Sequence, residues 1–301
     1  MVKYSREPHR YIGINPPIAI FSDGSPDENV DAATVRHFGM EWNKFSDYPD
    51  PEIEKIAKEY FDLVKEDILN KSSVVLDIGC GNGRFLKYLA PKVKFIEGID
   101  PSQSVLSASR NVKNHSNVRI TRADVHNIPF PDESFDFVLS LGVFHHVPSV
   151  RSALASAVRK LKPHGHLLLY LYYNLDNRNI LYRMFFIFSG FVRQLISRFP
   201  FPLKVICSNV IAFFVYLPFI ALAAGIKKLF PGKKWHASVP LSYYIGKSFY
   251  TIRNDALDRF GTPLEKRFCR NDIQTMMTEA GLSKIKFSEN PPFWHAIGKK
   301  L

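Results

Sequence analysis

Cysteine is scarce in this sequence, with three residues, at positions 80, 207 and 269, in a chain of 301. An odd number of widely spaced cysteines does not fit a disulfide framework or a metal cluster and suits a reducing compartment. Residues 1–10 also lack the apolar run of a secretory signal peptide. We therefore expect a cytoplasmic protein.

Acidic residues are too few to balance the basic ones: 28 Asp and Glu stand against 40 Lys and Arg, a net charge of +12. Such an excess suits nucleic acid or anionic lipid as a partner. Within residues 176–234 the only acid is Asp176, against nine basic residues: Arg178, Arg183, Arg193, Arg198, Lys204, Lys227, Lys228, Lys233 and Lys234. This basic stretch is also the most apolar part of the chain.

Regular periodicity is missing from residues 1–50, which predicts a largely irregular arm with one short helix at 32–37. From Pro51, apolar residues recur at spacings of three and four as far as Ile68, which predicts an amphipathic helix. Beyond it, five short apolar runs alternate with helical patterns, at 74–78, 95–99, 118–121, 135–141 and 167–172. This alternation predicts βαβ units and a parallel sheet with right-handed crossovers.

The alternation is interrupted and then resumes near the C-terminus. A helix is predicted at 271–280 with Gly281 as its stop, followed by an antiparallel pair of strands at 284–288 and 293–298. We therefore divide the chain into an arm or lid (1–50), a core (51–175), an inserted basic and apolar helical cap (176–253) and a segment that completes the sheet (254–301).

A glycine-rich turn follows the first buried strand: Asp77 is followed by Gly79, Gly81 and Gly83. Glycines let the backbone turn tightly and approach a ligand, and a helix that follows offers free N–H groups. Asp100 ends the next strand, 17 residues beyond Gly83, where a carboxylate can accept hydrogen bonds from ribose hydroxyls. Each of these residues has a structural alternative to ligand binding. The glycines could form an ordinary turn, Asp100 could cap a helix, and Asp124, which follows the third strand, could be a solvated loop acid.

In these segments the sequence resembles the class I S-adenosylmethionine (SAM)-dependent methyltransferases, over most of residues 73–173 and again over about 260–300. The matching stretches are VLDIGCGNG at 75–83, GIDPS at 98–102, AD at 123–124, PFPDESFD at 129–136 and LKPHG at 161–165. The resemblance implies a Rossmann-like, seven-stranded, mostly parallel sheet with an antiparallel last strand, to which the insertion adds an α-helical cap. Residues 257–268 also look like a bacterial subgroup with the same apolar insertion.

The resemblance also implies which residues bind SAM. Asp77 and the three glycines would contact the methionine part, Asp100 the ribose, and Asp124 with Val125 the adenine. The expected cofactor set also includes Cys80 and Pro101, from the same motifs, and Leu141, at the end of the fourth strand.

Two histidines, His145 and His146, follow the fourth strand of the core at the sheet edge where α/β proteins bind ligands. Either is a candidate base for an acceptor hydroxyl; helix capping and pocket shaping are the alternative. No metal site is expected, because a third clustered ligand is missing. Candidates for lining the acceptor pocket are Trp42, Tyr172, Tyr173, Tyr243, Tyr244 and Arg253, with aromatic packing as the alternative.

The insertion narrows the acceptor class. Residues 210–226 form 17 uncharged, mostly apolar positions, interrupted by Pro218 and followed by Lys227 and Lys228. A spanning helix needs about 20 residues. Apolar helices flanked by Lys and Arg fit the headgroup region at the inner face of the cytoplasmic membrane. A cap buried against the enzyme or an oligomer partner, and a true span, are the alternatives.

Three functions fit these observations. The first is methyl transfer, at oxygen, to a small amphiphilic acceptor such as a lipid, a quinone precursor or a lipid-linked sugar. The second is tRNA or other RNA methylation, although the basic residues border apolar helices rather than exposed aromatics. The third is a non-catalytic SAM-binding protein.

Overall fold

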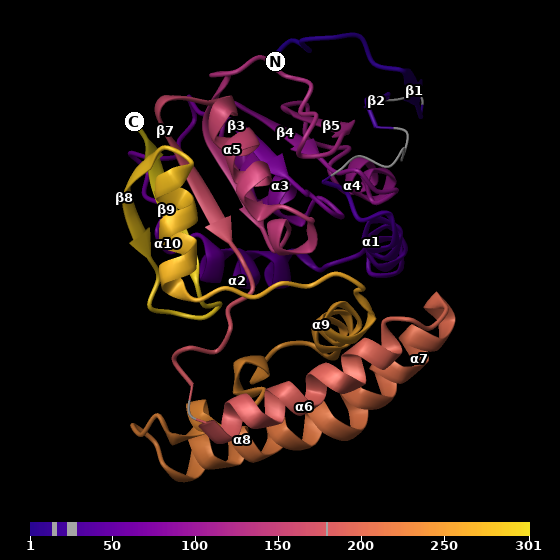
Figure 1. Ribbon diagram of the computed structural model, residues 1–301, viewed down its shortest axis with the longest axis vertical. Helices are drawn as coiled ribbons and strands as arrows, with labels where there is room; N and C mark the ends of the chain where they lie inside the picture. The colour runs from indigo at the N-terminus through magenta and orange to yellow at the C-terminus, as the bar shows by residue number, and fades with distance from the viewer. Residues whose placement is uncertain (14–16, 23–28, 179) are drawn as a thin grey trace. The chain divides into compact units, whose positions relative to one another are not determined.

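The computed structural model describes residues 1–13, 17–22, 29–178 and 180–301. These residues form two compact units, each described here by itself (Figure 1). The first unit comprises Met1–Asn174 and Leu264–Leu301, and the second is Leu175–Pro263. The second unit thus extends beyond Arg253, where the predicted cap ends.

The first unit is built on a nine-stranded sheet in the order β1-β2-β5-β4-β3-β6-β7-β9-β8. Its strands are β1 (Arg10–Ile12), β2 (Ile18–Ile20), β3 (Val74–Ile78), β4 (Phe95–Ile99), β5 (Val118–Arg122), β6 (Phe135–Leu141), β7 (Leu161–Tyr170), β8 (Leu282–Phe287) and β9 (His295–Lys300). Strands β2 to β7 pair in parallel, whereas β9 is antiparallel to both β7 and β8. The α/β, Rossmann-like class expected from the sequence is confirmed.

Two strands more than the expected seven come from the N-terminal segment, so the prediction of an irregular arm is wrong there. Strand β2 is buried throughout and pairs in parallel with β5, while β1 pairs with β2 in antiparallel register. Helix α1 (Ala32–Lys44) begins where the short helix at 32–37 was predicted but is longer; Asp31 caps its first turn, and it ends at Phe45.

The remaining helices of the first unit cover the sheet: α2 (Asp50–Tyr60), α3 (Arg84–Leu89), α4 (Val105–Asn111), α5 (Val150–Lys160) and α10 (Arg270–Glu279). Helix α3 packs beside α2 and α4, whereas α5 packs beside α10. With right-handed crossovers, the two groups lie on opposite faces of the sheet, because the strand order reverses between β3 and β6. This reversal is where such folds bind ligands.

Helix α2 ends at Tyr60, earlier than the period extending to Ile68 predicts. The chain turns away there because Asp62 holds the C-terminal strands: its carboxylate accepts hydrogen bonds from Ser288 Oγ (2.6 Å) and from Asn290 Nδ2 (3.2 Å), and it pairs with His295 Nε2 at 2.6 Å. Gly281, predicted to end the C-terminal helix, follows α10 and has a φ of +92°, as expected.

The second unit is helical. Its long elements are α6 (Ile180–Ile196), α7 (Phe201–Ile211), α8 (Leu217–Leu229) and α9 (Phe249–Gly261). One turn of π-helix, Ala212–Tyr216, joins α7 to α8, so the helix continues past Pro218 where the sequence suggested an interruption. Wider π turns accommodate a residue that lacks an N–H donor. Helix α9 supplies the core of this unit, where Ile252, Ala256 and Phe260 pack against Ile196 and Tyr216.

Candidate active site

The glycine turn lies at the carboxyl end of β3 and is bound to the end of β4. The backbone N–H groups of Gly79 and Cys80 both donate to the carbonyl oxygen of Ile99, at 2.8 and 3.0 Å. Gly79, Gly81 and Gly83 all have positive φ angles, of +80°, +54° and +81°. Other residues are strained in this region of backbone space, so the sequence needs glycine at these positions.

Each of these glycines also has a neighbour that a side chain would displace. A Cβ on Gly79 would lie 2.4 Å from Val143, and one on Gly81 would lie 3.1 Å from the indole of Trp42. A Cβ on Gly83 would lie 3.2 Å from Ala108, so this glycine lets α3 and α4 approach closely. Trp42, predicted to line the acceptor pocket, therefore packs on the glycine turn itself.

Asp100 connects the two strand ends. Its Oδ2 accepts a hydrogen bond from the Gly81 N–H at 3.1 Å, and its Oδ1 accepts from the N–H and the hydroxyl of Ser102, at 2.8 and 2.6 Å. Helix α4 begins later, after Ser104, so Asp100 is not its N-cap. A carboxylate has about four lone-pair sites, and three are engaged, which leaves acceptor capacity for a ligand.

Asp77, near the carboxyl end of β3 and just before this turn, carries a buried atom without a hydrogen-bond partner. The residue is 2% exposed, and its Oδ2 has no hydrogen-bond partner among the described residues. Burial raises the pKa of Asp77 to about 8, with a further contribution from the charge of Asp100 and opposition from Arg84. A buried carboxyl oxygen without a partner, beside a glycine turn, fits a ligand that brings a cationic or hydrogen-bonding group.

The other predicted cofactor residues line the neighbouring loops. Asp124 is 5% exposed, and its Oδ1 accepts from the N–H groups of His126 and Asn127, both at 2.9 Å. It is therefore a buried, loop-ordering acid rather than a solvated one. Val125 and Cys80 are buried, and burial raises the pKa of the Cys80 thiol well above its ordinary value. Pro101 and Leu141 are half-buried at the ends of β4 and β6.

The two histidines are buried side by side, with ring centroids 4.0 Å apart. His145 Nδ1 lies 3.3 Å from the N–H of Tyr172. An N–H only donates, so Nδ1 of His145 is the lone-pair nitrogen and Nε2 holds the proton. Burial, reinforced by His146, lowers the pKa of His145 well below its ordinary value, so this ring is neutral. Its Nε2–H has no partner among the described residues.

His146 has the opposite tautomer. Its Nδ1 lies 2.7 Å from the carbonyl oxygen of Leu264. A carbonyl only accepts, so Nδ1 carries the proton and Nε2 presents the lone pair. Phe38 of α1 packs on this ring at 4.8 Å. The two rings therefore differ in tautomer: Nε2 carries the proton in His145, and Nδ1 carries it in His146.

Two of the aromatic residues predicted for the acceptor pocket belong to this edge. Tyr172 stacks on His145 at 3.8 Å, and the guanidinium of Arg267 lies 5.0 Å from the Tyr172 ring. Tyr173 contacts Phe293, and its carbonyl accepts from Arg267 at 3.0 Å. Arg267 was not singled out from the sequence, because it lies in a separate segment of the chain.

Tyr243, Tyr244 and Arg253 belong to the second unit. There the Lys247 ammonium lies 4.0 Å from the Tyr243 ring, Tyr244 contacts Tyr216 at 5.5 Å, and Arg253 donates to Asn209 Oδ1 at 2.8 Å. Burial raises the pKa of Tyr244 well above its ordinary value. Their role in an acceptor pocket stays a prediction.

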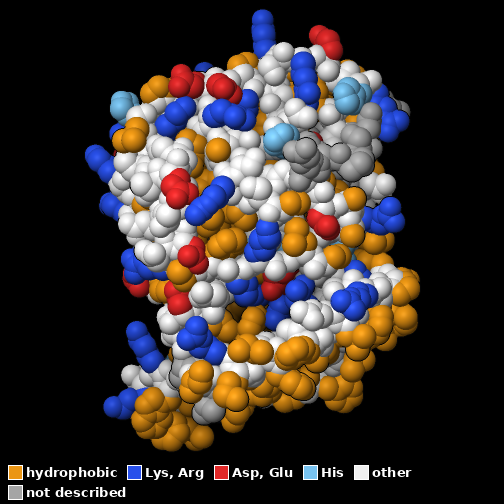
Figure 2. All heavy atoms as spheres, viewed as in Figure 1, with side chains coloured by type: hydrophobic (Ala, Val, Ile, Leu, Met, Phe, Trp, Pro, Cys, Tyr) orange, Lys and Arg blue, Asp and Glu red, His pale blue; other side chains and the backbone are white. Residues whose placement is uncertain are grey.

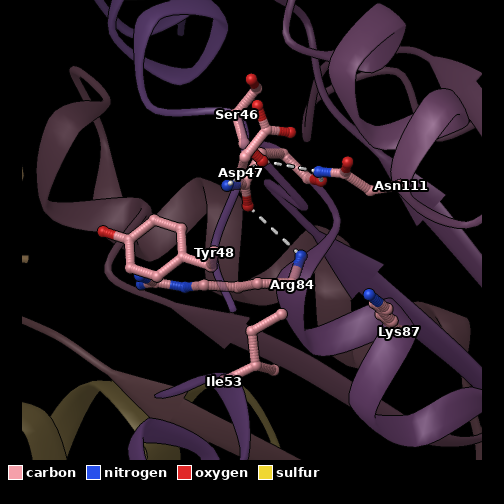
Figure 3. A pocket seen from close by; sticks show the side chains of 8 residues that line it. Ser46, Asp47, Tyr48, Ile53, Arg84, Lys87 and Asn111 are labelled. Atoms are coloured by element: carbon pink, nitrogen blue, oxygen red, sulfur yellow. Dashed lines mark hydrogen bonds between the residues drawn. The ribbon is translucent and has the colours of Figure 1, made fainter. Parts of the chain in front are cut away.

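A small cavity of about 110 Å³ adjoins the glycine turn at the start of α3 (Figure 3). Its lining comprises Ser46, Asp47, Tyr48, Ile53, Asn82, Arg84, Lys87 and Asn111. Asn82 and Asn111 tie this wall together by donating to the backbone of the loop between α1 and α2. Sequence analysis missed these residues, although Asn82 lies within the glycine motif. Within the described part of the chain, no cluster of three His, Cys, Asp or Glu residues could hold a metal ion.

Comparison with known proteins places this geometry in a family. Residues 76–169 match the family model described as a methyltransferase domain. An uncharacterized methyltransferase, YcgJ, of Bacillus subtilis is 33% identical over 126 residues, which are 40% of this chain and 50% of that protein. A demethylmenaquinone methyltransferase of Tropheryma whipplei is 38% identical over 96 residues, 31% of this chain and 39% of that one.

A phthiotriol/phenolphthiotriol dimycocerosates methyltransferase of Mycobacterium tuberculosis is 34% identical over 94 residues, 31% of this chain and 35% of that one. The chain thus spans about half or less of the length of these curated relatives. Among solved structures, the complex of the Haloferax volcanii Trm112 methyltransferase activator with a methyltransferase contains a chain that aligns with a TM-score of 0.50. The identity is 13%, and the match covers 87% of this chain and 96% of that chain.

These matches and the sheet topology agree on the class. The chain contains a domain of the class I SAM-dependent methyltransferase family.

Proposed function

We propose that this protein transfers a methyl group from SAM to an oxygen atom of a small, amphiphilic acceptor. The observation that carries the proposal is the arrangement of Asp77, the glycine turn and Asp100 at the strand-order reversal. A buried carboxyl oxygen without a partner lies just before a turn in which three of five residues are glycine, and this turn is hydrogen-bonded to a second carboxylate. This arrangement fits a cofactor with an ammonium group and a ribose.

SAM, when bound, supplies an electrophilic methyl group on a sulfonium. The chain's own residues would hold two parts of it: Asp77 would be the partner of the ammonium group, and Asp100 would accept hydrogen bonds from the ribose. Methyl transfer to a hydroxyl also requires removal of a proton, and alignment of the acceptor contributes most of the rate.

The different tautomers of the two histidines suit them to different roles toward the acceptor hydroxyl. The Nε2–H of His145 donates to the acceptor oxygen and holds it in place. Nε2 of His146 takes the hydroxyl proton, and the Leu264 carbonyl, bound to Nδ1–H at 2.7 Å, stabilises the imidazolium that results. Both roles need a small acceptor, because the two rings are buried.

The amphiphilic nature of the acceptor is supported by the composition of the second unit and by two relatives. Those relatives are named for methylating demethylmenaquinone and phthiotriol dimycocerosates. The distribution of charge favours this class over RNA, because the basic residues of 176–234 border apolar helices.

The test is to feed methyl-labelled methionine to cells with and without the gene and to compare label in the lipid extract and in small RNA. We expect one lipid or quinone species to lose its label when the gene is deleted. Loss of label from RNA alone would contradict the acceptor class and leave the cofactor assignment in place.

A further inference from the structure

The second unit has an exposed apolar surface. Among the described residues of this unit, the exposed large apolar side chains are Ile180, Met184, Phe185, Ile187, Phe188, Phe191, Leu195, Leu203, Ile206, Val210, Phe213, Phe214, Leu222, Leu229, Phe230, Trp235 and Phe249. In Figure 2 hydrophobic side chains form a nearly continuous band along the helices of this unit. Soluble proteins rarely expose contiguous apolar patches of this kind without a binding partner.

The exposed residues follow the helical period. On α6 they are, besides Phe185 (40% exposed), Ile180, Met184, Ile187, Phe188, Phe191 and Leu195, and on α7 and the π turn they are Leu203, Ile206, Val210, Phe213 and Phe214. Steps of three and four residues place each set on one side of its helix. The other sides already have a partner, because α9 packs against both α6 and α7. We call these two exposed stripes the apolar face.

Basic and aromatic side chains gather where α8 ends. Lys227, Lys228, Lys233 and Lys234 are all exposed, and none of them has an ion pair among the described residues. Next to these lysines in the chain, Phe230 and Trp235, 44% and 56% exposed, are in contact, with tilted rings whose centroids are 4.9 Å apart. Lysines attract anionic lipid headgroups, and Trp prefers the boundary between headgroups and acyl chains.

Charge decides against a second copy of the chain as the occupant. Residues 175–263 contain twelve Lys and Arg but three Asp and Glu. Two such surfaces would repel each other, whereas an anionic bilayer attracts both. The first unit offers no matching apolar surface either: its exposed large apolar side chains within the described residues are Met1, Tyr11, Met40, Leu106 and Leu301.

The helix Phe201–Leu229, 29 residues long, is apolar enough to cross a membrane by length and composition, and 17% of its most apolar window is buried. Its contacts argue against a span. Lys204 Nζ donates to the Gly261 carbonyl of α9 at 2.7 Å, and Asn209 accepts from Arg253. Spanning would therefore carry the charged side chains of α9 into hydrocarbon.

We propose that the second unit is a monotopic membrane-docking module, whose apolar face enters the boundary between the headgroups and acyl chains of an anionic bilayer and whose four lysines bind the headgroups. This inference goes beyond methyl transfer and does not depend on it. SAM binding by the first unit therefore tests the proposed methyl transfer and does not bear on membrane docking.

Co-sedimentation of the full chain with vesicles tests the proposal. One set is pure phosphatidylcholine, and the other contains a third phosphatidylglycerol. We expect binding to both, tighter to the anionic set. The double substitution Phe188→Ser and Phe214→Ser, at positions 67% and 69% exposed, should lower the partition coefficient about tenfold or more. Leu106→Ser with Leu301→Ser, in the first unit, is the matched control and should leave it unchanged.

The charge component is tested by replacing Lys227, Lys228, Lys233 and Lys234 with Glu. The partition coefficient of this variant on anionic vesicles should fall about a hundredfold, so that the preference for anionic vesicles is lost. The matched control replaces four exposed lysines of the first unit, Lys3, Lys65, Lys94 and Lys113, with Glu and keeps the same net charge. Far-UV circular dichroism and thermal unfolding, measured on every variant, report whether each remains folded.

Four results would overturn the proposal: absence of binding to both vesicle sets, equal loss in the test and control variants, a stable dimer that hides the apolar face, or release from cell membranes by detergent alone and not by alkaline carbonate. The last result would identify a span.

Discussion

The substitution Asp77→Asn tests the centre of the cofactor site. Asp77 is buried, one of its carboxyl oxygens has no partner, and burial, more than repulsion from Asp100, raises its pKa to about 8. If the ionised carboxylate binds the ammonium group of SAM, then affinity depends on the fraction of Asp77 that is ionised. Asn is nearly the same shape and cannot ionise, so the substitution changes charge with little change in packing.

The magnitude follows from two titrations. A carboxyl with a pKa of about 8 is about half ionised at pH 8 and about 1% ionised at pH 6. An α-amino group with a pKa near 8 is about half protonated at pH 8 and almost fully protonated at pH 6. Their product predicts that the affinity of the wild type for SAM rises about twenty-five-fold, or ~1.9 kcal/mol, from pH 6 to pH 8. The Asn variant should bind more weakly at pH 8 and show a slight trend in the opposite direction.

Stability of the ligand-free protein should change in the reverse sense. Because the folded state raises the pKa of Asp77, it retains a proton that the unfolded chain loses above about pH 4. The stabilisation due to this proton is present below about pH 4 and is lost progressively as pH rises to about 8. Asp77→Asn should therefore raise the melting temperature at pH 8 and leave it nearly unchanged at pH 4.

Titration calorimetry with SAM at pH 6, 7 and 8, together with thermal unfolding at the same values and at pH 4, measures both effects. A wild-type affinity that is flat over this range, matched by the Asn variant, would refute the role of Asp77 as the charged partner of the cofactor.

Asp100→Asn should weaken SAM binding by about 1–3 kcal/mol in calorimetry, because a ribose hydroxyl loses a charged acceptor; unchanged affinity would remove Asp100 from the site. His146→Gln should lower kcat by about 10²–10⁴-fold with SAM affinity retained, and an unaltered rate with the identified acceptor would exclude it as the base. Burial alone raises the pKa of Asp62, but hydrogen bonds from Ser288 and His295 outweigh it and hold that pKa below its ordinary value. Their stabilisation is present above about pH 4 and is lost as pH falls through the lowered pKa, so Asp62→Asn should flatten the acid side of the stability profile; an unchanged profile would contradict this.

The central strands and the glycine turn could be predicted from the sequence because their patterns are local. Strands buried on both faces are nearly continuous apolar runs, and β3, β4 and β6 begin and end where those runs do. Gly79 and Gly81 were recognisable because few other arrangements require two left-handed residues directly after a buried strand.

The N-terminal strands and the full length of α1 could not be predicted, because the segment before β2 is held by distant residues and α1 buries polar ones. The hydroxyl of Tyr4 bonds to Thr121 at 2.8 Å, and Arg119 donates to the Val2 carbonyl while pairing with the buried Glu97. In α1, His37 and Glu41 pair at 3.2 Å although both are buried. Because the buried side of α1 includes polar residues, its sequence shows no apolar periodicity from which the helix could be predicted.

The tautomers of the two histidines could not be predicted from the sequence either. The sequence shows that His145 and His146 are adjacent, but the groups that fix their protons, the N–H of Tyr172 and the carbonyl of Leu264, lie far along the chain. The acceptor pocket proposed from the sequence grouped Tyr172 and Tyr173 with Tyr243, Tyr244 and Arg253 of the insertion, and the structure assigns these two groups to different units.

The most direct test of the account is to incubate the purified protein with SAM labelled in its methyl group, in separate reactions with lipid extract and with small RNA from cells that lack the gene. The account predicts label in the lipid extract, formed in step with S-adenosylhomocysteine and reduced by His146→Gln. Label in RNA alone, or no label in either fraction while SAM is bound, would contradict it.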